Sequence, residues 1–256
     1  MKAARARAKE VSFAPRAMPH FVPPLLSFVA GYIDVVTFVA LFGLYVAQVT
    51  GSFVVVGAQI VGHEPSAAFI AVLAIPIFLL AAIATVFFCY WLARQGRSLL
   101  GWSLALETFL IAAFYGCAWA GPLDNPNGRL TLAASVFALA AMGVQSALVR
   151  LLMRNVASTN VMTTNTSVLG VDAAEFLLAW NEKRKFSKSR RARNKFKKAR
   201  KSFYALIQIT LGFIAGAALG AAVYHEVGVN ALIAPTGIAA VLAAWAFERD
   251  LVSGNL

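Results

Sequence analysis

One carboxylate stands inside the first long apolar run of this chain, where its chemistry is unusual. Asp34 lies within the apolar stretch 25–44. A charged side chain near the centre of a bilayer costs about 2.5–3.5 kcal/mol on insertion scales, so it faces other protein groups rather than lipid. We therefore expect Asp34 to act as a proton or cation site. The alternative is a structural hydrogen bond to the Thr-rich segment that follows it.

Two hydroxyl-rich segments, one in each half of the chain, could supply polar ligands. The first is Thr50-Gly51-Ser52 and the second begins at Thr163. Thr and Asn side chains beside an interrupted membrane helix can satisfy its freed backbone groups or coordinate a small solute or ion. The alternative is helix packing, because small hydroxylated residues let membrane helices approach closely. The predicted lining of a solute or ion site is Asp34, Thr50, Gly51, Ser52, Gln145, Thr163, Thr164 and Asn165.

Further acidic residues within apolar stretches could form a second charged site. Glu107 lies inside the stretch 99–120, and Asp172 lies late in the stretch 159–180. The alternatives are helix pairing for Glu107 and neutralisation of nearby basic residues for Asp172. The chain has no catalytic triad pattern, no His-Glu-x-x-His pattern, no phosphate-binding Gly-rich loop and no nucleotide fingerprint. We therefore expect no catalytic residues, no metal site and no cofactor.

The composition excludes a water-soluble enzyme and a disordered chain. Of the 256 residues, 60% are apolar and 13% are charged, whereas soluble domains have about 45–50% apolar and about 25% charged residues. A bilayer core requires about 20 helical residues per crossing. We predict an all-α polytopic membrane bundle of six crossing helices and two short or broken segments, the second and sixth. The apolar stretches are 25–44, 46–62, 67–93, 99–120, 130–152, 159–180, 203–223 and 229–247.

The basic residues predict how the chain crosses the membrane. The formal net charge is +12, and 12 of the 23 Lys and Arg residues lie between positions 183 and 201. With six crossings, 22 of the 23 fall on the side of the N-terminus, against 19 of the 23 with eight crossings. The positive-inside rule favours six crossings and cytoplasmic termini in a bacterial inner membrane. We expect the basic loop to contact anionic lipid rather than nucleic acid; its lipid-facing residues include Lys183, Arg184, Lys185, Arg190, Arg191 and Arg193.

The two halves of the chain resemble each other. Gly31-Tyr32-Ile33-Asp34 aligns with Gly143-Val144-Gln145-Ser146, and Thr50 then aligns with Thr163. Three crossings per half would place the halves in opposite orientations, a recurring transporter design. A separate pattern, Gly212-x₃-Gly216-x₃-Gly220, predicts a packing face within the bundle or between protomers. The predicted regions are a basic tail (1–20), a membrane domain (21–248, with halves 25–120 and 130–248 and a basic loop 181–201) and a C-terminal tail (249–256).

A family resemblance rests on three of these motifs. They are the run 28–38 (FVAGYIDVVTF) with Val49-Thr50-Gly51-Ser52 after it, the segment 141–146 (AMGVQS), and Thr163-Thr164. Together they resemble the YoaK-type bacterial membrane proteins, defined by domain of unknown function 1275, from about Leu25 to Phe247. Ser52 and Ser146 stand where that family usually has Asn. The resemblance implies an integral membrane protein but no substrate.

These observations leave three functional hypotheses. The first is a permease or channel-like carrier with a polar site for a small solute or ion between the two halves. The second is a non-transporting scaffold that oligomerises through the Gly212 face and binds anionic lipid. The third, an intramembrane enzyme, lacks a catalytic set. The carrier hypothesis with Asp34 as its charged group requires Asp34 and the Thr-rich segments to meet at one hydrated cavity.

Overall fold

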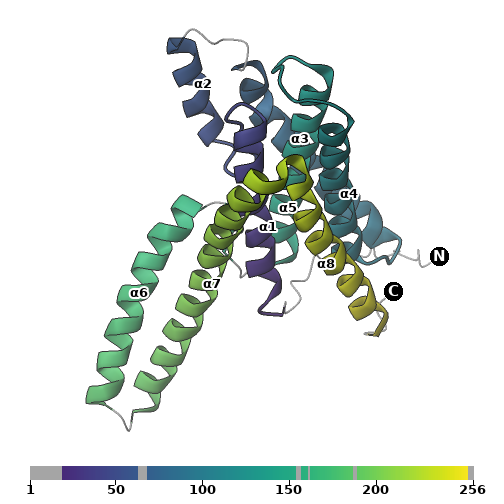
Figure 1. Cartoon of the computed structure of the whole chain (residues 1–256). Coiled ribbons are helices and arrows are strands. Elements are labelled where there is room, and N and C mark those ends of the chain that lie inside the picture. Colours follow the sequence, from purple (N-terminus) through teal and green to yellow (C-terminus); the bar gives the residue numbers. More distant parts are fainter. Residues whose placement is uncertain (1–18, 63–67, 154–156, 161, 187–188, 253–256) are drawn as a thin grey trace, which may run out of the picture.

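The described part of the chain contains helices and connecting loops but no strands, as the all-α prediction requires. The computed structural model describes residues 19–62, 68–153, 157–160, 162–186 and 189–252. Figure 1 shows these helices as a bundle with a long hairpin projecting from one side. In chain order they are α1 (Val22–Ala40), α2 (Gly51–Val61), α3 (Ala68–Arg94), α4 (Leu99–Ala120), α5 (Arg129–Leu152), α6 (Met162–Lys185), α7 (Arg190–Val227), a short 3-10 helix η1 (Gly228–Leu232) and α8 (Ile233–Val252).

Five stretches of the described chain are long and apolar enough to cross a membrane. The first four coincide with α1, α3, α4 and α5, and the fifth is the helical stretch Arg190–Asp250. The fifth contains two arms, because η1 reverses the chain and α8 runs back down the bundle against α4, diverging from α7 (Figure 1). The protein is therefore a polytopic helical membrane protein. The 11 residues of α2 span only about 16 Å, which is too short to cross about 30 Å of hydrocarbon.

The helices α1 and α5 run in opposite directions. The start of α1 shares an apolar cluster with the end of α5, in which Leu26 packs with Leu148. The end of α1 shares another cluster with the start of α5, in which Val36 packs with Ala134. The first helix of each half therefore has the opposite orientation, as the predicted inversion requires.

The predicted glycine face lies inside the bundle, between α7 and α1. A β-carbon at Gly212 would lie 2.5 Å from the carbonyl oxygen of Pro24, and one at Gly216 would overlap the carbonyl oxygen of Phe28. At Gly220 the nearest backbone atom is the carbonyl oxygen of Tyr32, at 3.0 Å. The two backbones can touch only because these positions carry no side chain. Because α1 covers this face, it is not available for the oligomer contact considered above.

A second pair of glycines shows that the same packing occurs in both halves. A β-carbon at Gly31 of α1 would overlap the carbonyl oxygen of Phe213 and lie 3.2 Å from the amide nitrogen of Ala217, both on α7. At the aligned Gly143 of α5, it would lie 2.7 Å from the carbonyl oxygen of Phe78 and 3.5 Å from the amide nitrogen of Ala82, both on α3. The pairs α1–α7 and α5–α3 therefore pack in equivalent ways.

Helix ends on one side of the bundle are tied together by a serine. Ser98 caps α4, because its hydroxyl accepts a hydrogen bond from the amide of Gly101 at 3.0 Å, and it also donates to the carboxylate of Asp250 at the end of α8. This contact joins the basic ends of α3 and α8, and the packing of Phe21 against Trp245, with ring centres 5.2 Å apart, places the start of α1 on the same side. Most basic residues of the bundle therefore gather at one end, as predicted.

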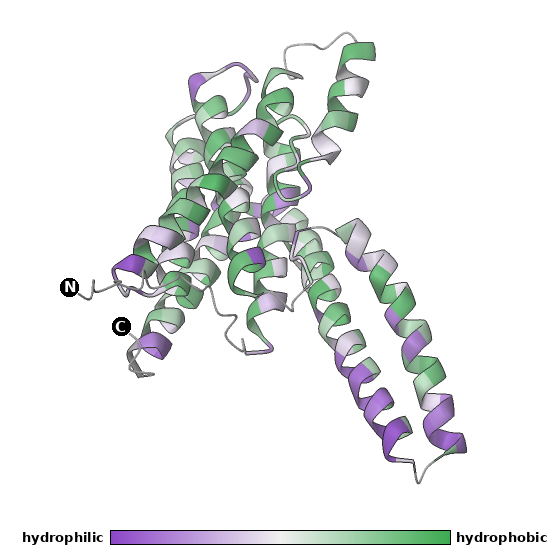
Figure 2. Cartoon of the chain, turned by 180° about the vertical axis from the view of Figure 1, so that it is seen from behind, coloured by the Kyte–Doolittle hydropathy of each residue, from purple (hydrophilic) through white to green (hydrophobic). Residues whose placement is uncertain are grey.

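The segment expected to be a basic loop is instead a helical hairpin. The helix α6 continues to Lys185, and α7 begins at Arg190. Among the described elements, α6 packs only on α7. Figure 2 shows that hydrophilic residues dominate the far half of this hairpin. Lys and Arg have high helix propensity, so the helices extend beyond the apolar stretch instead of unwinding at its end.

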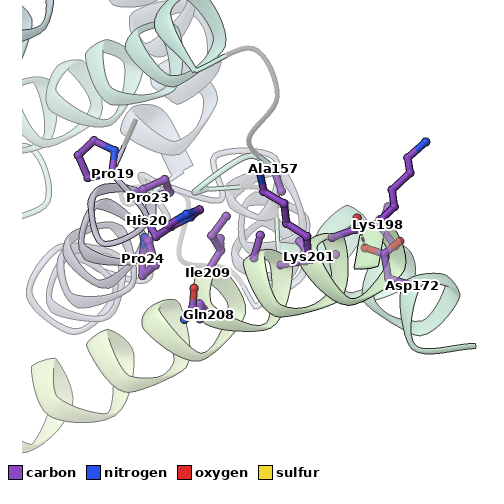
Figure 3. A pocket seen from close by; sticks show the side chains of 14 residues that line it. Pro19, His20, Pro23, Pro24, Ala157, Asp172, Lys198, Lys201, Gln208 and Ile209 are labelled. Atoms are coloured by element: carbon purple, nitrogen blue, oxygen red, sulfur yellow. Dashed lines mark hydrogen bonds between the residues drawn. The ribbon is translucent and has the colours of Figure 1, made fainter. Parts of the chain in front are cut away.

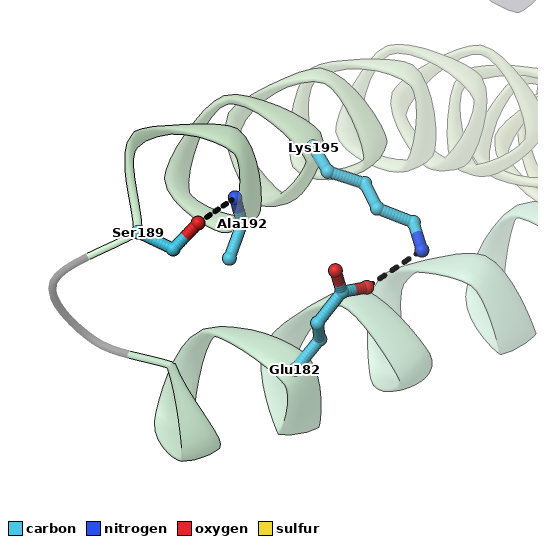
Figure 4. A network of polar contacts seen from close by, with 4 residues as sticks. All are labelled: Glu182, Ser189, Ala192 and Lys195. Atoms are coloured by element: carbon cyan, nitrogen blue, oxygen red, sulfur yellow. Dashed lines mark hydrogen bonds and ion pairs between the residues drawn. The ribbon is translucent and has the colours of Figure 1, made fainter.

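Polar contacts and aromatic rings hold the two arms of the hairpin together. Lys195 forms an ion pair with Glu182 at 2.6 Å, and Ser189 caps α7 by accepting from the amide of Ala192 at 3.4 Å (Figure 4). The ammonium group of Lys183 lies 4.3 Å from the ring centre of Phe196. The other predicted lipid-facing cations are solvent-exposed on the same hairpin: Arg184, Lys185, Arg190, Arg191 and Arg193.

Candidate functional site

Asp34 holds the loop that connects α1 to α2. One carboxylate oxygen accepts hydrogen bonds from the backbone amides of Val46 and Ala47, each at 2.8 Å. Asp34 is only 4% exposed. Two hydrogen bonds to one buried side-chain oxygen therefore attach this loop to α1.

The loop can reach Asp34 because α1 ends in a sharp reversal. Phe42 and Gly43 have positive φ angles of 55° and 84°, a conformation that ends a helix and returns the chain towards it. The amide of Gly43 donates to the carbonyl of Phe38 at 2.9 Å. Ser52 closes the far end of the loop, since its hydroxyl donates to the carbonyl of Tyr45 at 3.0 Å and accepts from the amide of the same residue at 3.2 Å.

Gln145 has the equivalent role in the second half. Its side-chain amide donates to the hydroxyl of Thr159 at 3.0 Å and to the side-chain oxygen of Asn160 at 3.1 Å, and it also reaches the carbonyl of Leu26 at 3.0 Å. Thr159 and Asn160 belong to the segment that precedes α6. In each half, a polar side chain of the first helix therefore fixes the segment that precedes the next helix, which is α2 in the first half and α6 in the second.

The predicted lining residues form two separate groups rather than one site, so the structure does not form the carrier site that was expected around Asp34. Asp34 and Ser52 belong to an outer group around the α1–α2 loop, and Gln145 belongs to an inner group beside Leu26. Leu26 and Asp34 are eight residues apart on α1, which is about 12 Å along the helix axis. The two groups are apart because inversion places equivalent loops at opposite levels of the bundle.

A cavity of about 770 Å³ lies beside the inner group, between α3, α5 and α6. Two of the predicted lining residues, Thr164 and Asn165, border it. Asn165 is 3% exposed, and its side-chain amide donates to the carbonyl of Ser158 at 2.5 Å. Ser146, which aligns with Asp34 in the repeat, also borders the cavity. The full lining is Ala82, Ile83, Val86, Ser146, Ala147, Val149, Arg150, Leu151, Met153, Ala157, Ser158, Thr164, Asn165 and Val168.

The charge in this cavity comes from one arginine. Arg150 is exposed, and no Asp or Glu stands among the described residues that border the cavity. Hydroxyl and amide groups supply the other polar atoms. Arg150, Ser146 and Ser158 were not among the predicted site residues, because no short motif links them and only the fold brings them together.

The remaining predicted site residues lie away from this cavity. Thr50 and Thr163 are exposed at the starts of α2 and α6, and a β-carbon at Gly51 would lie 3.0 Å from the ring of Tyr45. Asp172 on α6 accepts a hydrogen bond from the hydroxyl of Ser202 on α7 at 2.7 Å. Glu107 is fully buried, and among the described residues neither of its carboxyl oxygens has a hydrogen-bond partner. The two acids of the predicted second charged site therefore differ, since among the described residues only Asp172 has a hydrogen-bond partner.

Comparison with known families places the chain in one of them. A family model described as "Protein of unknown function (DUF1275)" matches residues 24–245. No curated protein and no solved structure matches the chain. The protein therefore belongs to the DUF1275 family, as its motifs predicted, and is an integral membrane protein without an assigned activity.

Proposed function

We propose that this protein carries a small anionic solute across the membrane, and that the 770 Å³ cavity is its cytoplasm-facing binding site. The observation that carries this proposal is the cavity itself, which combines Arg150 with the hydroxyl and amide groups of Ser146, Ser158, Thr164 and Asn165. Ligand sites of about 300–1,000 Å³ that are mostly apolar, with a few convergent polar groups, are typical of small-molecule binding.

The packing of the two halves supports alternating access. Inverted halves can exchange conformations, so that a site open to one side closes while the equivalent site on the other side opens. Asp34 is sealed by its own loop, whereas the aligned Ser146 borders an accessible cavity. This difference between equivalent positions corresponds to a carrier that is open on the inner side and closed on the outer side.

The residues that border the cavity favour an anion over a cation. An arginine can bind a carboxylate or phosphate group with two parallel hydrogen bonds. A cation would meet the positive charge of Arg150 with no bordering carboxylate to compensate for it. The proposed substrate class is therefore a small solute with one carboxylate, phosphate or similar anionic group.

Flux measurements test this function directly. Purified protein in proteoliposomes is exposed to gradients of acetate, phosphate, sulfate and chloride, with sodium and potassium as cation probes. We expect flux of at least one anion, and a loss of tenfold or more in Arg150→Gln and in Asn165→Ala. Arg129→Gln, which removes a charge at the opposite end of the bundle, is the matched control and keeps its flux. Flux of cations alone, or of none of these ions, would contradict the proposal and leave the scaffold hypothesis.

Site accessibility provides an independent test of where the cavity opens. In a Cys89→Ala/Cys117→Ala background, Ser146→Cys and Thr164→Cys should react with a membrane-impermeant thiol reagent applied from the cytoplasmic side. Val241→Cys, which is 69% exposed on the apolar surface of α8, is the control that should remain unlabelled. Labelling of the two cavity positions from the opposite side alone would reverse the proposed orientation.

A further inference from the structure

A second cavity lies where the hairpin leaves the bundle. Its volume is about 350 Å³, and it is bordered by the start of α1, by α6 and by α7. Figure 3 shows His20, Pro23 and Pro24 beside Gln208 and Ile209 towards one end, and Asp172, Lys198 and Lys201 towards the other. This cavity lies at the basic end of the bundle and does not belong to the solute site.

The character of this cavity changes along α7. Lys198 and Lys201 provide two cations at one end, and Leu206 and Ile209 provide an apolar wall at the other. Lys198 and Ile209 are separated by eleven residues, or about 16 Å along the helix. An occupant that fits this gradient has an anionic group joined to a hydrocarbon chain.

The net charge of the residues that border this second cavity indicates the charge of the occupant that would neutralise it. Asp172 lies beside the two lysines, and the hydroxyl of Ser202 donates to its carboxylate at 2.7 Å. Two cations and one carboxylate leave a net charge of about one positive unit at this end. That charge matches a single phosphodiester better than a headgroup with several phosphates.

We propose that this cavity binds one anionic phospholipid from the inner leaflet. Its phosphodiester lies at Lys198 and Lys201, and one acyl chain follows Leu206, Ile209 and Pro24. Each Lys near an anionic headgroup contributes on the order of 1 kcal/mol, and the apolar wall adds the burial of a hydrocarbon chain. A free phosphate ion would use only the charged end of the cavity.

This lipid site adjoins the solute cavity and so has a regulatory consequence. Ala157 and Val168 border both cavities, and the segment between them carries Ser158 and Asn165. A lipid bound on one side therefore holds the segment that forms the wall of the other cavity. This regulatory consequence rests on the proposed carrier function, whereas the lipid site itself does not.

Lipid binding to the purified full-length protein tests the site without any measurement of flux. Binding of phosphatidylglycerol and of phosphatidylcholine is compared by native mass spectrometry or by the shift in thermal midpoint. We expect phosphatidylglycerol to bind more tightly, and Lys198→Gln/Lys201→Gln to weaken its binding about thirtyfold, as the loss of two cations predicts. Asp172→Asn should strengthen it, because the net positive charge rises.

The control variant removes the same charge elsewhere on the hairpin. Arg190→Gln/Arg191→Gln lies at the far tip and should change phosphatidylglycerol affinity less than about threefold. An equal loss in both double variants would indicate a general surface effect and overturn the specific site. Displacement of the lipid by inorganic phosphate at similar concentration would identify a free anion as the ligand and overturn the lipid assignment. A positive binding result without solute flux would leave the lipid site valid and remove the carrier function.

Discussion

The α1–α2 loop and the segment before α6 are each held by one side chain of the preceding long helix. The hydrogen-bonding groups differ between the two. Asp34 uses a carboxylate to bind backbone amides of the outer loop, whereas Gln145 uses a neutral amide to bind side chains of the inner segment. Backbone amides are present whatever the loop sequence is, while the inner contacts require Thr159 and Asn160 themselves. The outer loop is closed over its acid, and the inner segment borders the large cavity. The attachment of the outer loop therefore tolerates a change of loop sequence, whereas the attachment of the inner segment does not.

The largest expected effect comes from breaking the outer attachment. Asp34→Ala leaves two buried backbone amides without an acceptor, and each unsatisfied group costs about 1–3 kcal/mol. We expect a loss of about 2–5 kcal/mol in the free energy of unfolding, measured by denaturant titration in detergent micelles. Asp34→Asn keeps an oxygen acceptor and should lose less than half as much. If both variants unfold like the wild type, Asp34 does not hold the loop.

The equivalent glycines test whether the two halves pack alike. Gly31→Ala and Gly143→Ala force a methyl group against a backbone carbonyl on α7 or α3, and overpacking of this kind typically costs about 1–3 kcal/mol. The loss should be larger at Gly31, where the overlap is greater. Gly57→Ala on α2 is the control, because nothing lies within 4 Å of the added atom. Stability loss at only one of the two equivalent positions would argue against equivalent packing.

A double-mutant cycle measures the inner attachment by itself. Gln145→Leu and Asn160→Ala remove two ends of one hydrogen-bond network, so their effects should be non-additive by about 0.5–2 kcal/mol. Asp34→Asn combined with Asn160→Ala should be additive, because the outer and inner groups are separate. Unfolding free energies of the single and double variants test both statements. Strong coupling between Asp34 and Asn160 would instead join the two groups into one network.

The smallest change in stability is expected at Glu107, the buried acid without a hydrogen-bond partner among the described residues. Both carboxyl oxygens of Glu107 lack a partner among the described residues, so Glu107→Leu removes a polar group without orphaning another. Replacing an unpaired buried polar group with an apolar one is near neutral or stabilising. We expect a change between about zero and 1 kcal/mol of added stability in the same titration. A loss comparable to that of Asp34→Ala would reveal an unrecognised partner of Glu107.

The sequence predicted what depends on local pattern. Apolar run lengths predicted the long helices, the spacing of Gly212, Gly216 and Gly220 predicted a packing face, and the motifs around Asp34 predicted the family. Each of these signals lies within a short stretch of chain. They therefore appear in the amino-acid order without knowledge of the fold.

The partners of Asp34 and the wall of the cavity were not predicted, because the groups that form them have no recognisable sequence motif. The partners of Asp34 are backbone amides, which every non-proline residue has, so nothing in positions 46–47 marks them. The cavity wall includes Ala82 and Val86, which are indistinguishable from lipid-facing residues until α5 and α6 are placed beside them. The basic segment was expected to be a loop because charge excludes it from lipid, yet charge does not prevent a helix from continuing into water.

The length of α7 has a mechanical consequence. Its 38 residues extend about 57 Å, and only the part from Gly212 onward lies against α1 through the glycine contacts. The 22 residues from Arg190 to Gly212 form an arm of about 33 Å, so a tilt of about 10° at the glycines displaces its tip by roughly 6 Å. Small changes of tilt deep in the bundle are thus magnified into larger displacements at the charged tip of the hairpin.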